Sequence, residues 1–229
     1  MRKLALAGLG LCLTLGAANT KTGVEVATTQ RVDLQANWGV RVSGSLGQLN
    51  IEGWDQPAVE ITLIRTLYRE DAPDKRDKAK QQMERIRVTA EQRGEDIVIG
   101  TTFPKRAFWK RLGGKTGVAL DYRLRVPRHA RLVIRHGSGD ILINDSEGDI
   151  DASVGTGTIV LQLPVDGSYA IDARCRAGKV NSDFEGVYHH PLWIGQTFAE
   201  GSEASTHELR LRTGVGDIDI QKISAPAKQ

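Results

Sequence analysis

A short triplet of glycine, a polar residue and an aliphatic residue recurs through the second half of the chain. It occurs as Gly139-Asp140-Ile141, Gly148-Asp149-Ile150 and Gly157-Thr158-Ile159 at a spacing of nine residues, and again at residues 178–180 and 216–218. Because glycine readily adopts positive φ, each triplet indicates a turn followed by a short strand whose aliphatic residue points inward. Repeated units of this kind predict stacked short strands around an apolar ladder.

Apolar and polar residues alternate in further short stretches, which favours strands with one buried face. These stretches cover residues 40–43, 49–52, 59–63, 97–99, 122–126 and 132–134. The period changes after Asp71, where Ala79, Met83 and Ile86 recur at helical spacing. The predicted fold class is therefore all-β: a β-solenoid or β-helix-like stack of short strands with one amphipathic helix over about 72–87.

The N-terminus has the residue order of a secretory signal peptide. Arg2 and Lys3 precede an apolar stretch over residues 4–15, and small residues follow at 16–18. We expect residues 1–18 to be a signal peptide, 19–34 an N-terminal lead-in, 35–223 a single β domain and 224–229 a flexible tail. The mature chain is expected to lack a transmembrane segment and to be periplasmic, with a cell-surface or secreted location as the alternative.

Removal of the signal would leave Cys175 as the mature chain's single cysteine, so an internal disulfide is not expected. Cys175 lies in the alternating stretch 170–176, which favours a buried apolar role over a reactive thiol.

The motifs of common catalytic and metal sites do not match the sequence. A calcium-binding β-roll places aspartate two residues after its last glycine, where this chain has Ile141 and Ile150. The stretch Gly113-Gly114-Lys115-Thr116 lacks the first glycine of a phosphate loop, because Trp109 holds that position. We therefore expect no catalytic residue, no cofactor and no metal site. A glycan hydrolase with two carboxylates in a cleft is kept as a lesser alternative.

The histidines do not have a spacing that suits a metal site, and a surface or loop position is expected for each. They are His129, His136, His189, His190 and His207.

The most distinctive polar stretch is a basic segment interleaved with aromatic residues at 103–115. It contains five basic residues and no acidic residue, and ten basic residues against one acidic residue lie between Gly100 and His136. Such a segment could dock on an anionic surface, or its aromatic rings could pack beneath it while the cations extend into solvent. The candidate interaction surface consists of Phe103, Lys105, Arg106, Phe108, Trp109, Lys110, Arg111 and Lys115.

Three groups of residues give the chain a family resemblance over roughly residues 35–222. They are the module Gly47-Gln48-Leu49-Asn50-Ile51-Glu52-Gly53-Trp54-Asp55, the stretch Leu124-Arg125-Val126-Pro127 and the glycine triplets. In these the chain resembles the bacterial putative-adhesin family, a domain of unknown function found in exported proteins. The resemblance implies a β-solenoid-like fold and a location in the cell envelope, and it brings no catalytic residues.

These observations favour an exported, non-enzymatic β-repeat domain that serves as a binding or structural module in the cell envelope. The expected partner is an envelope protein, or an anionic lipid or glycan surface, and the export signal argues against nucleic acid. The alternative is an accessory or sensor protein of an envelope stress response that acts through a protein partner.

Overall fold

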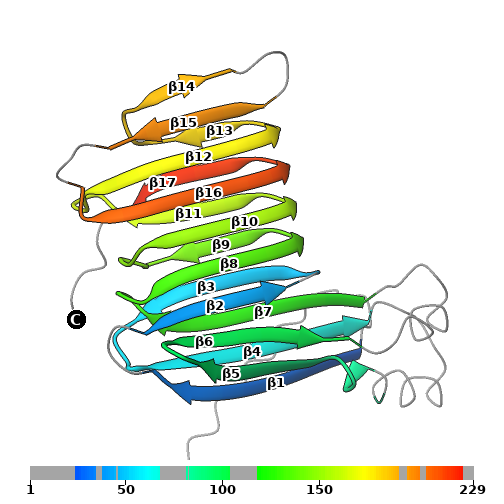
Figure 1. Cartoon of the computed structure of the whole chain (residues 1–229). Helices are drawn as coiled ribbons and strands as arrows, with labels where there is room; N and C mark the ends of the chain where they lie inside the picture. Colours follow the sequence, from blue (N-terminus) through cyan, green and yellow to red (C-terminus); the bar gives the residue numbers. More distant parts are fainter. Residues whose placement is uncertain are drawn as a thin grey trace, which may run out of the picture.

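The structure, a computed structural model, describes residues 24–34, 38–44, 46–67, 81, 83–103, 118–190, 195–201 and 205–223. The expected signal peptide and C-terminal tail lie outside these residues. The all-β prediction is confirmed: the described strands form two mixed sheets that face each other (Figure 1). None of the described residues form a helix long and apolar enough to cross a membrane.

The first sheet has eight strands. Their spatial order is β1 (Val24–Asp33), β4 (Ala58–Leu67), β7 (Val118–Pro127), β3 (Gln48–Trp54), β9 (Ile141–Asn144), β11 (Ile159–Pro164), β17 (Ile218–Ile223) and β13 (Val180–Ser182).

The second sheet has nine strands. Their spatial order is β14 (Val187–His189), β15 (Gln196–Glu200), β12 (Tyr169–Ala177), β16 (His207–Val215), β10 (Ile150–Thr156), β8 (Arg131–Ser138), β2 (Gly39–Gly44), β6 (Asp96–Thr102) and β5 (Arg87–Arg93).

Consecutive strands alternate between the two sheets over most of the chain, so that each pair forms one layer of the stack. The layers follow one another as β6–β7, β2–β3, β8–β9, β10–β11, β16–β17 and β12–β13. Neighbouring layers pair in parallel in both sheets, whereas β1, β4, β5, β14 and β15 add antiparallel strands at the two ends. Strands β16 and β17 are the last two along the chain, but their layer lies inside the stack, between β10–β11 and β12–β13.

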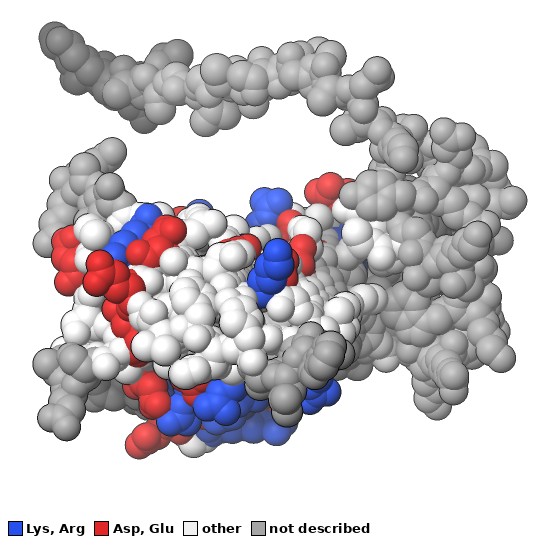
Figure 2. All heavy atoms as spheres, turned by 90° about the horizontal axis from the view of Figure 1, so that it is seen from above, with Lys and Arg blue, Asp and Glu red and all other residues white. Residues whose placement is uncertain are grey.

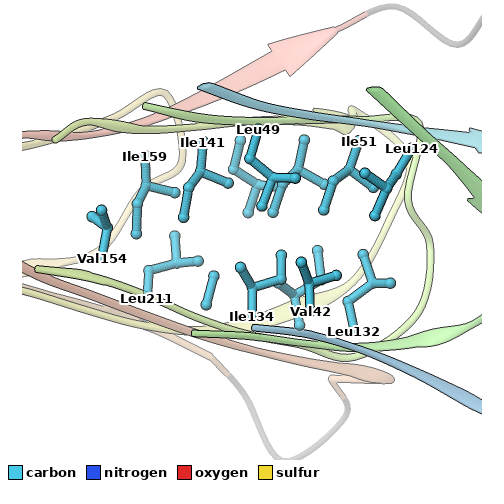
Figure 3. Close-up of a cluster of buried hydrophobic side chains, with 14 of the residues drawn as sticks. Val42, Leu49, Ile51, Leu124, Leu132, Ile134, Ile141, Val154, Ile159 and Leu211 are labelled. Carbon is cyan, nitrogen blue, oxygen red and sulfur yellow. The ribbon is translucent and has the colours of Figure 1, made fainter. Parts of the chain in front are cut away.

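The hydrophobic core fills the space between the sheets. Figure 3 shows Leu49, Ile51 and Ile141 of the first sheet facing Val42 and Ile134 of the second sheet. The predicted inner ladder is confirmed, because Ile141 and Ile159 are fully buried and Ile150 is 1% exposed. Burial of one such side chain contributes about 1.5–3 kcal/mol, so the ladder supplies much of the force that holds the sheets together.

A column of glycines forms one corner of the stack, and its geometry explains why the repeat begins with glycine. Gly47, Gly139, Gly157, Gly216 and Gly178 all have φ between 119° and 145°. A Cβ atom on Gly157 would lie 2.2 Å from the carbonyl oxygen of Gly139 in the next layer. Both the positive φ and the close backbone contact thus exclude a larger residue at this corner.

Aspartates of the triplets join adjacent layers at the same corner. The Asp140 Oδ1 atom accepts a hydrogen bond from the Thr158 N–H at 2.9 Å, and Asp217 Oδ1 accepts one from the Lys179 N–H at 2.7 Å. Each aspartate thus joins the turn of its own layer to the backbone of the next layer.

The helix expected over 72–87 falls largely outside the described residues, which omit 68–80 and 82. Gln81 and Met83 have helical backbone conformation, and the Ile86 N–H donates to the Met83 carbonyl oxygen at 3.0 Å. Strand β5 begins at Arg87, so the predicted C-terminal bound of the helix is wrong. The apolar residues Met83 and Ile86 are both buried, and the chain turns into the second sheet directly after them.

His136 is a second correction, because it is buried and not on the surface or in a loop. Its side chain is 6% exposed, and its Nε2 atom lies 2.7 Å from the Gly47 carbonyl oxygen. Its position follows from the alternation of β8, in which Leu132, Ile134 and His136 point inward. Cys175 is buried and has a free thiol, as predicted.

Candidate functional site

Of the basic and aromatic segment predicted from the sequence as an interaction surface, the structure describes the first residue, Phe103. Phe103 is half-buried and packs against the hydrophobic core. The other seven residues of this candidate surface lie outside the described residues: Lys105, Arg106, Phe108, Trp109, Lys110, Arg111 and Lys115. That candidate surface therefore stays a prediction.

A second cationic surface lies on the outer side of the second sheet and was not predicted. Strands β2, β8, β10, β16 and β12 alternate between buried and more exposed residues, so their polar residues share the face that points away from the core. We call this surface the arginine face. Its seven arginines are Arg41, Arg131, Arg135, Arg174, Arg176, Arg210 and Arg212.

Carboxylates on the arginine face are fewer than its cations. The five strands carry Asp151, Asp172 and Glu208 at outward positions, and Asp96 lies on the neighbouring strand β6. The arginine face thus has a formal excess of positive charge. Figure 2 shows cationic side chains gathered along one margin of the molecule, beside a broad area of uncharged residues.

The corresponding outer face of the first sheet has a different composition. Among the described residues, the outward positions of β3, β9, β11, β17 and β13 hold Asn, Gln, Leu, Ile, Val, Pro, Trp, Glu and Asp, but neither Arg nor Lys. The excess of arginine therefore distinguishes these five strands of the second sheet from the matching five of the first, whose neighbour β7 carries Arg123 and Arg125 on its outer side.

Four of the seven arginines, Arg41, Arg131, Arg135 and Arg212, form ion pairs with a carboxylate on another strand. Arg135 Nη1 and Nη2 lie 2.9 and 2.6 Å from the two carboxylate oxygens of Asp151 on the next strand. The hydrogen bond from Arg135 is the main reason that the pKa of Asp151 lies below its ordinary value. Asp96 likewise accepts hydrogen bonds from Arg41 at 2.9 Å and from Arg131 at 3.0 Å.

Two arginines share a single carboxylate, Asp172, at the β12 end of the arginine face, and a third lies on the same strand. Arg174 donates through Nε and Nη2 to both oxygens of Asp172, at 3.0 and 3.1 Å. Arg212, on the adjacent strand β16, donates from Nη2 to Asp172 Oδ2 at 2.6 Å. Arg176 is two residues beyond Arg174 on the same side of β12, is exposed, and has no ion-pair partner among the described residues.

The charge of Asp172 reflects this environment. Partial desolvation acts to raise the pKa of Asp172, but the hydrogen bonds from Arg174 and Arg212 outweigh it and bring the pKa below its ordinary value. Asp172 is therefore ionised at neutral pH. The three arginines and this one carboxylate, which we call the Asp172 cluster, carry a formal charge of +2.

A shallow open groove of about 460 Å³ lies at the end of the stack, where β13 and β14 are the last strands of their sheets. It is lined by Lys179, Val180, Asn181, Tyr188, His190 and Gln196. The Gln196 Oε1 atom accepts the Val180 N–H at 2.9 Å, which covers part of the free edge of β13. Within the part of the chain that the structure describes, no group of three or more His, Cys, Asp or Glu residues is placed to hold a metal ion.

A sequence signal for the arginine face exists. Within strands of alternating pattern, arginines recur an even number of residues apart, which places them on the same face of the strand: at 131 and 135, at 174 and 176, and at 210 and 212. Net charge hides this signal, because fourteen acidic residues outnumber seven basic residues after His136. Many of those acids lie in turns, whereas the arginines share one face.

No family model matches the chain. No curated protein matches it either.

Among solved structures, the chain is similar to a putative cell adhesion protein from Clostridium sporogenes ATCC 15579. The two share 13% sequence identity and a TM-score of 0.51, over 87% of this chain and 100% of that chain. Two further structures match with a TM-score of 0.26 each. One is a putative adhesin from Parabacteroides distasonis ATCC 8503, at 12% identity over 69% of this chain and 68% of that chain. The other is a putative adhesin from Bacteroides fragilis NCTC 9343, at 11% identity over 85% of this chain and 97% of that chain. The match at a TM-score of 0.51 confirms the expected resemblance at the level of the fold, to a putative cell adhesion protein.

Proposed function

We propose that this chain is an exported, non-enzymatic, adhesin-like binding module of the bacterial cell envelope, and that it docks on anionic partners through the arginine face. Periplasmic location and removal of a signal peptide belong to the same proposal. The parallel layers, in which strands alternate between the sheets, support a description of the fold as a short β-solenoid-like stack.

The observation that carries the proposal is the fixed excess of arginine on one sheet. Arg131 and Arg174 have side chains 55% and 60% exposed, so both remain accessible while they are ion-paired. Arginine is suited to oxyanions because its planar guanidinium donates in a fork and stays charged. Similarity of fold to a protein described as a putative cell adhesion protein supports the same class of function.

The experiment compares charge removal on the two faces of the protein. The double variant Arg131→Gln/Arg174→Gln removes two cations from the arginine face, and Arg123→Gln/Arg125→Gln removes two from the outer side of β7. Binding to immobilised heparin, a sulfated polymer, is measured over a salt series, with circular dichroism as the test of folding. We expect weaker, salt-sensitive binding for the first variant and near-normal binding for the second.

Two results would contradict this proposal. Equal losses for both variants would mean that net charge and not the arginine face controls binding. Unchanged binding of both folded variants would place the binding surface elsewhere, with the segment 103–115 as the next candidate.

A further inference from the structure

The arginine face is not uniform, and its end around Asp172 differs from the rest. Arg135 and Asp151 form a one-to-one pair, in which the carboxylate offsets the charge of the guanidinium. At the other end of the face, a single carboxylate serves Arg174 and Arg212, and Arg176 lies beside them on the same strand as Arg174. At the β2 end Arg41 and Arg131 share Asp96, which leaves a formal charge of +1 there, so the excess of positive charge is largest at the Asp172 cluster, with +2.

Asp172 fixes the guanidinium groups and leaves much of their hydrogen-bonding capacity free. Arg174 uses two of its five N–H groups in the described bonds, both to Asp172. The Arg212 guanidinium donates to the Asp172 carboxylate, the Asp172 carbonyl and the Leu211 carbonyl. Arg176 has no ion pair among the described residues. Arg174 and Arg212 therefore present oriented, charged N–H donors, and Arg176 adds an exposed cation that no described ion pair holds.

The strand neighbours of Arg176 are glycines that pack closely against backbone, because a Cβ atom on Gly195 would lie 2.7 Å from the Arg176 carbonyl oxygen. The registered pairs Cys175–Thr213 and Ala177–Val215 place Arg176 opposite Gly214 on β16. On the other side of β12, Gly195 precedes Gln196, which pairs with Cys175. The Arg176 side chain itself is exposed.

We infer that the Asp172 cluster recognises a phosphate or sulfate ester group on an anionic glycan, an inference that rests on the function proposed above. A tetrahedral ester offers three terminal oxygens as acceptors, which suits several guanidinium groups better than the two oxygens of a carboxylate. Among the residues that the structure describes, no exposed large hydrophobic side chain lies at an outward position of these five strands, and the nearest in register with Asp172 is Val187, two strands away on β14; this favours a glycan over a membrane. Insertion into a bilayer would require such residues.

In this inference Asp172 acts as a positioning residue, and its removal has an effect opposite to that expected from charge alone. Replacing Asp172 by Asn adds one positive charge to the arginine face, so simple attraction predicts tighter binding of an anion. The inference predicts weaker binding, by about tenfold, because Arg174 and Arg212 lose the bonds that orient them. Asp151→Asn adds the same charge to the same face but leaves the Asp172 cluster intact, and it is the matched control.

The test measures binding of a fluorescent heparin octasaccharide, with polyglutamate of equal charge as the carboxylate probe. Vesicles containing phosphatidic acid present the same kind of ester on a lipid. We expect D172N to lose affinity for the octasaccharide and to lose its preference over polyglutamate, while D151N keeps or gains affinity. Circular dichroism melts confirm that both variants are folded.

Tighter octasaccharide binding by D172N than by the unmodified protein would overturn the inference, as would a preference for the vesicles. Two further double variants distinguish failure of this inference from failure of the proposed function. If R174Q/R176Q and R41Q/R131Q lose octasaccharide binding equally, the arginine face binds by charge alone and only the inference fails. If neither pair loses binding, the proposed function fails as well.

Discussion

Replacement of Gly157 by alanine provides a quantitative test of the glycine corner. The residue has a φ of 142°, which costs an L-amino acid about 1–3 kcal/mol. The new Cβ atom would lie 2.2 Å from the Gly139 carbonyl oxygen, a backbone atom of the next layer. Overpacking of this kind adds about 1–3 kcal/mol. We therefore expect Gly157→Ala to lower the free energy of unfolding by about 2–6 kcal/mol.

Two other glycines separate these contributions. Gly94 has a φ of 64°, but no atom lies within 4 Å of the position that a Cβ would take. Gly94→Ala should therefore show the backbone cost alone, about 1–2 kcal/mol. Gly100 lies in β6 without positive φ, and a Cβ there would only meet the Thr89 hydroxyl at 3.7 Å. Gly100→Ala should therefore be neutral or slightly stabilising.

The assay is equilibrium unfolding in urea, followed by circular dichroism, with thermal melts in parallel. A loss of about 3 kcal/mol corresponds to about 9 °C in Tm for a chain of this size. If Gly157→Ala proves no more destabilising than Gly94→Ala, then the layers can separate enough to accept a side chain, and the argument from close backbone contact is refuted.

Three further predictions concern the core, the ion pairs and the thiol. Ile159→Ala should cost about 2–5 kcal/mol in urea unfolding, whereas Val160→Ala, on the outer side of the same strand, should cost under about 1 kcal/mol; similar values would refute the inner ladder. The folded-state pKa values of Asp96, Asp151 and Asp172 lie below the ordinary 3.8. The ion pairs of these carboxylates therefore stabilise the fold above about pH 4, and this stabilisation is lost as the pH falls through the lowered pKa values. Thermal melts from about pH 7 to about pH 2.5 should show this loss, and a Tm that is independent of pH would contradict it. Burial raises the pKa of Cys175, so its reaction with a thiol reagent at about pH 8 should be at least about 100-fold slower than in urea, and an equal rate would show that the strand end is open.

Local patterns in the sequence predicted local structure well. Alternation and the glycine triplets located the strands and the inner ladder because a period of two has a direct meaning on a sheet. The same reasoning missed His136, since a lone histidine gives no indication that its Nε2 atom will reach the Gly47 carbonyl from a distant part of the chain.

The candidate site was harder to predict because it depends on the order of strands. Arg174 and Arg212 are far apart in the sequence, and they become neighbours because β12 pairs with β16. Sequence reasoning weighed charge along contiguous segments, and so it selected residues 103–115. A face assembled from five strands has no contiguous segment of its own.

The position of β16 and β17 inside the stack bears on the order in which the protein can be assembled. Ile150 of β10 pairs with Leu209 of β16, much later in the sequence, and β16 in turn pairs with Tyr169–Ala177 of β12. As the chain is synthesised from its N-terminus, β10 and β12 each leave an unpaired strand edge until β16 arrives. Such distant pairings slow folding and leave edges open to wrong partners. Strand β16 therefore joins the two parts of the second sheet, since it pairs with β10 on one side and β12 on the other. The arginine face and the Asp172 cluster are complete only after this late segment has been inserted between those strands.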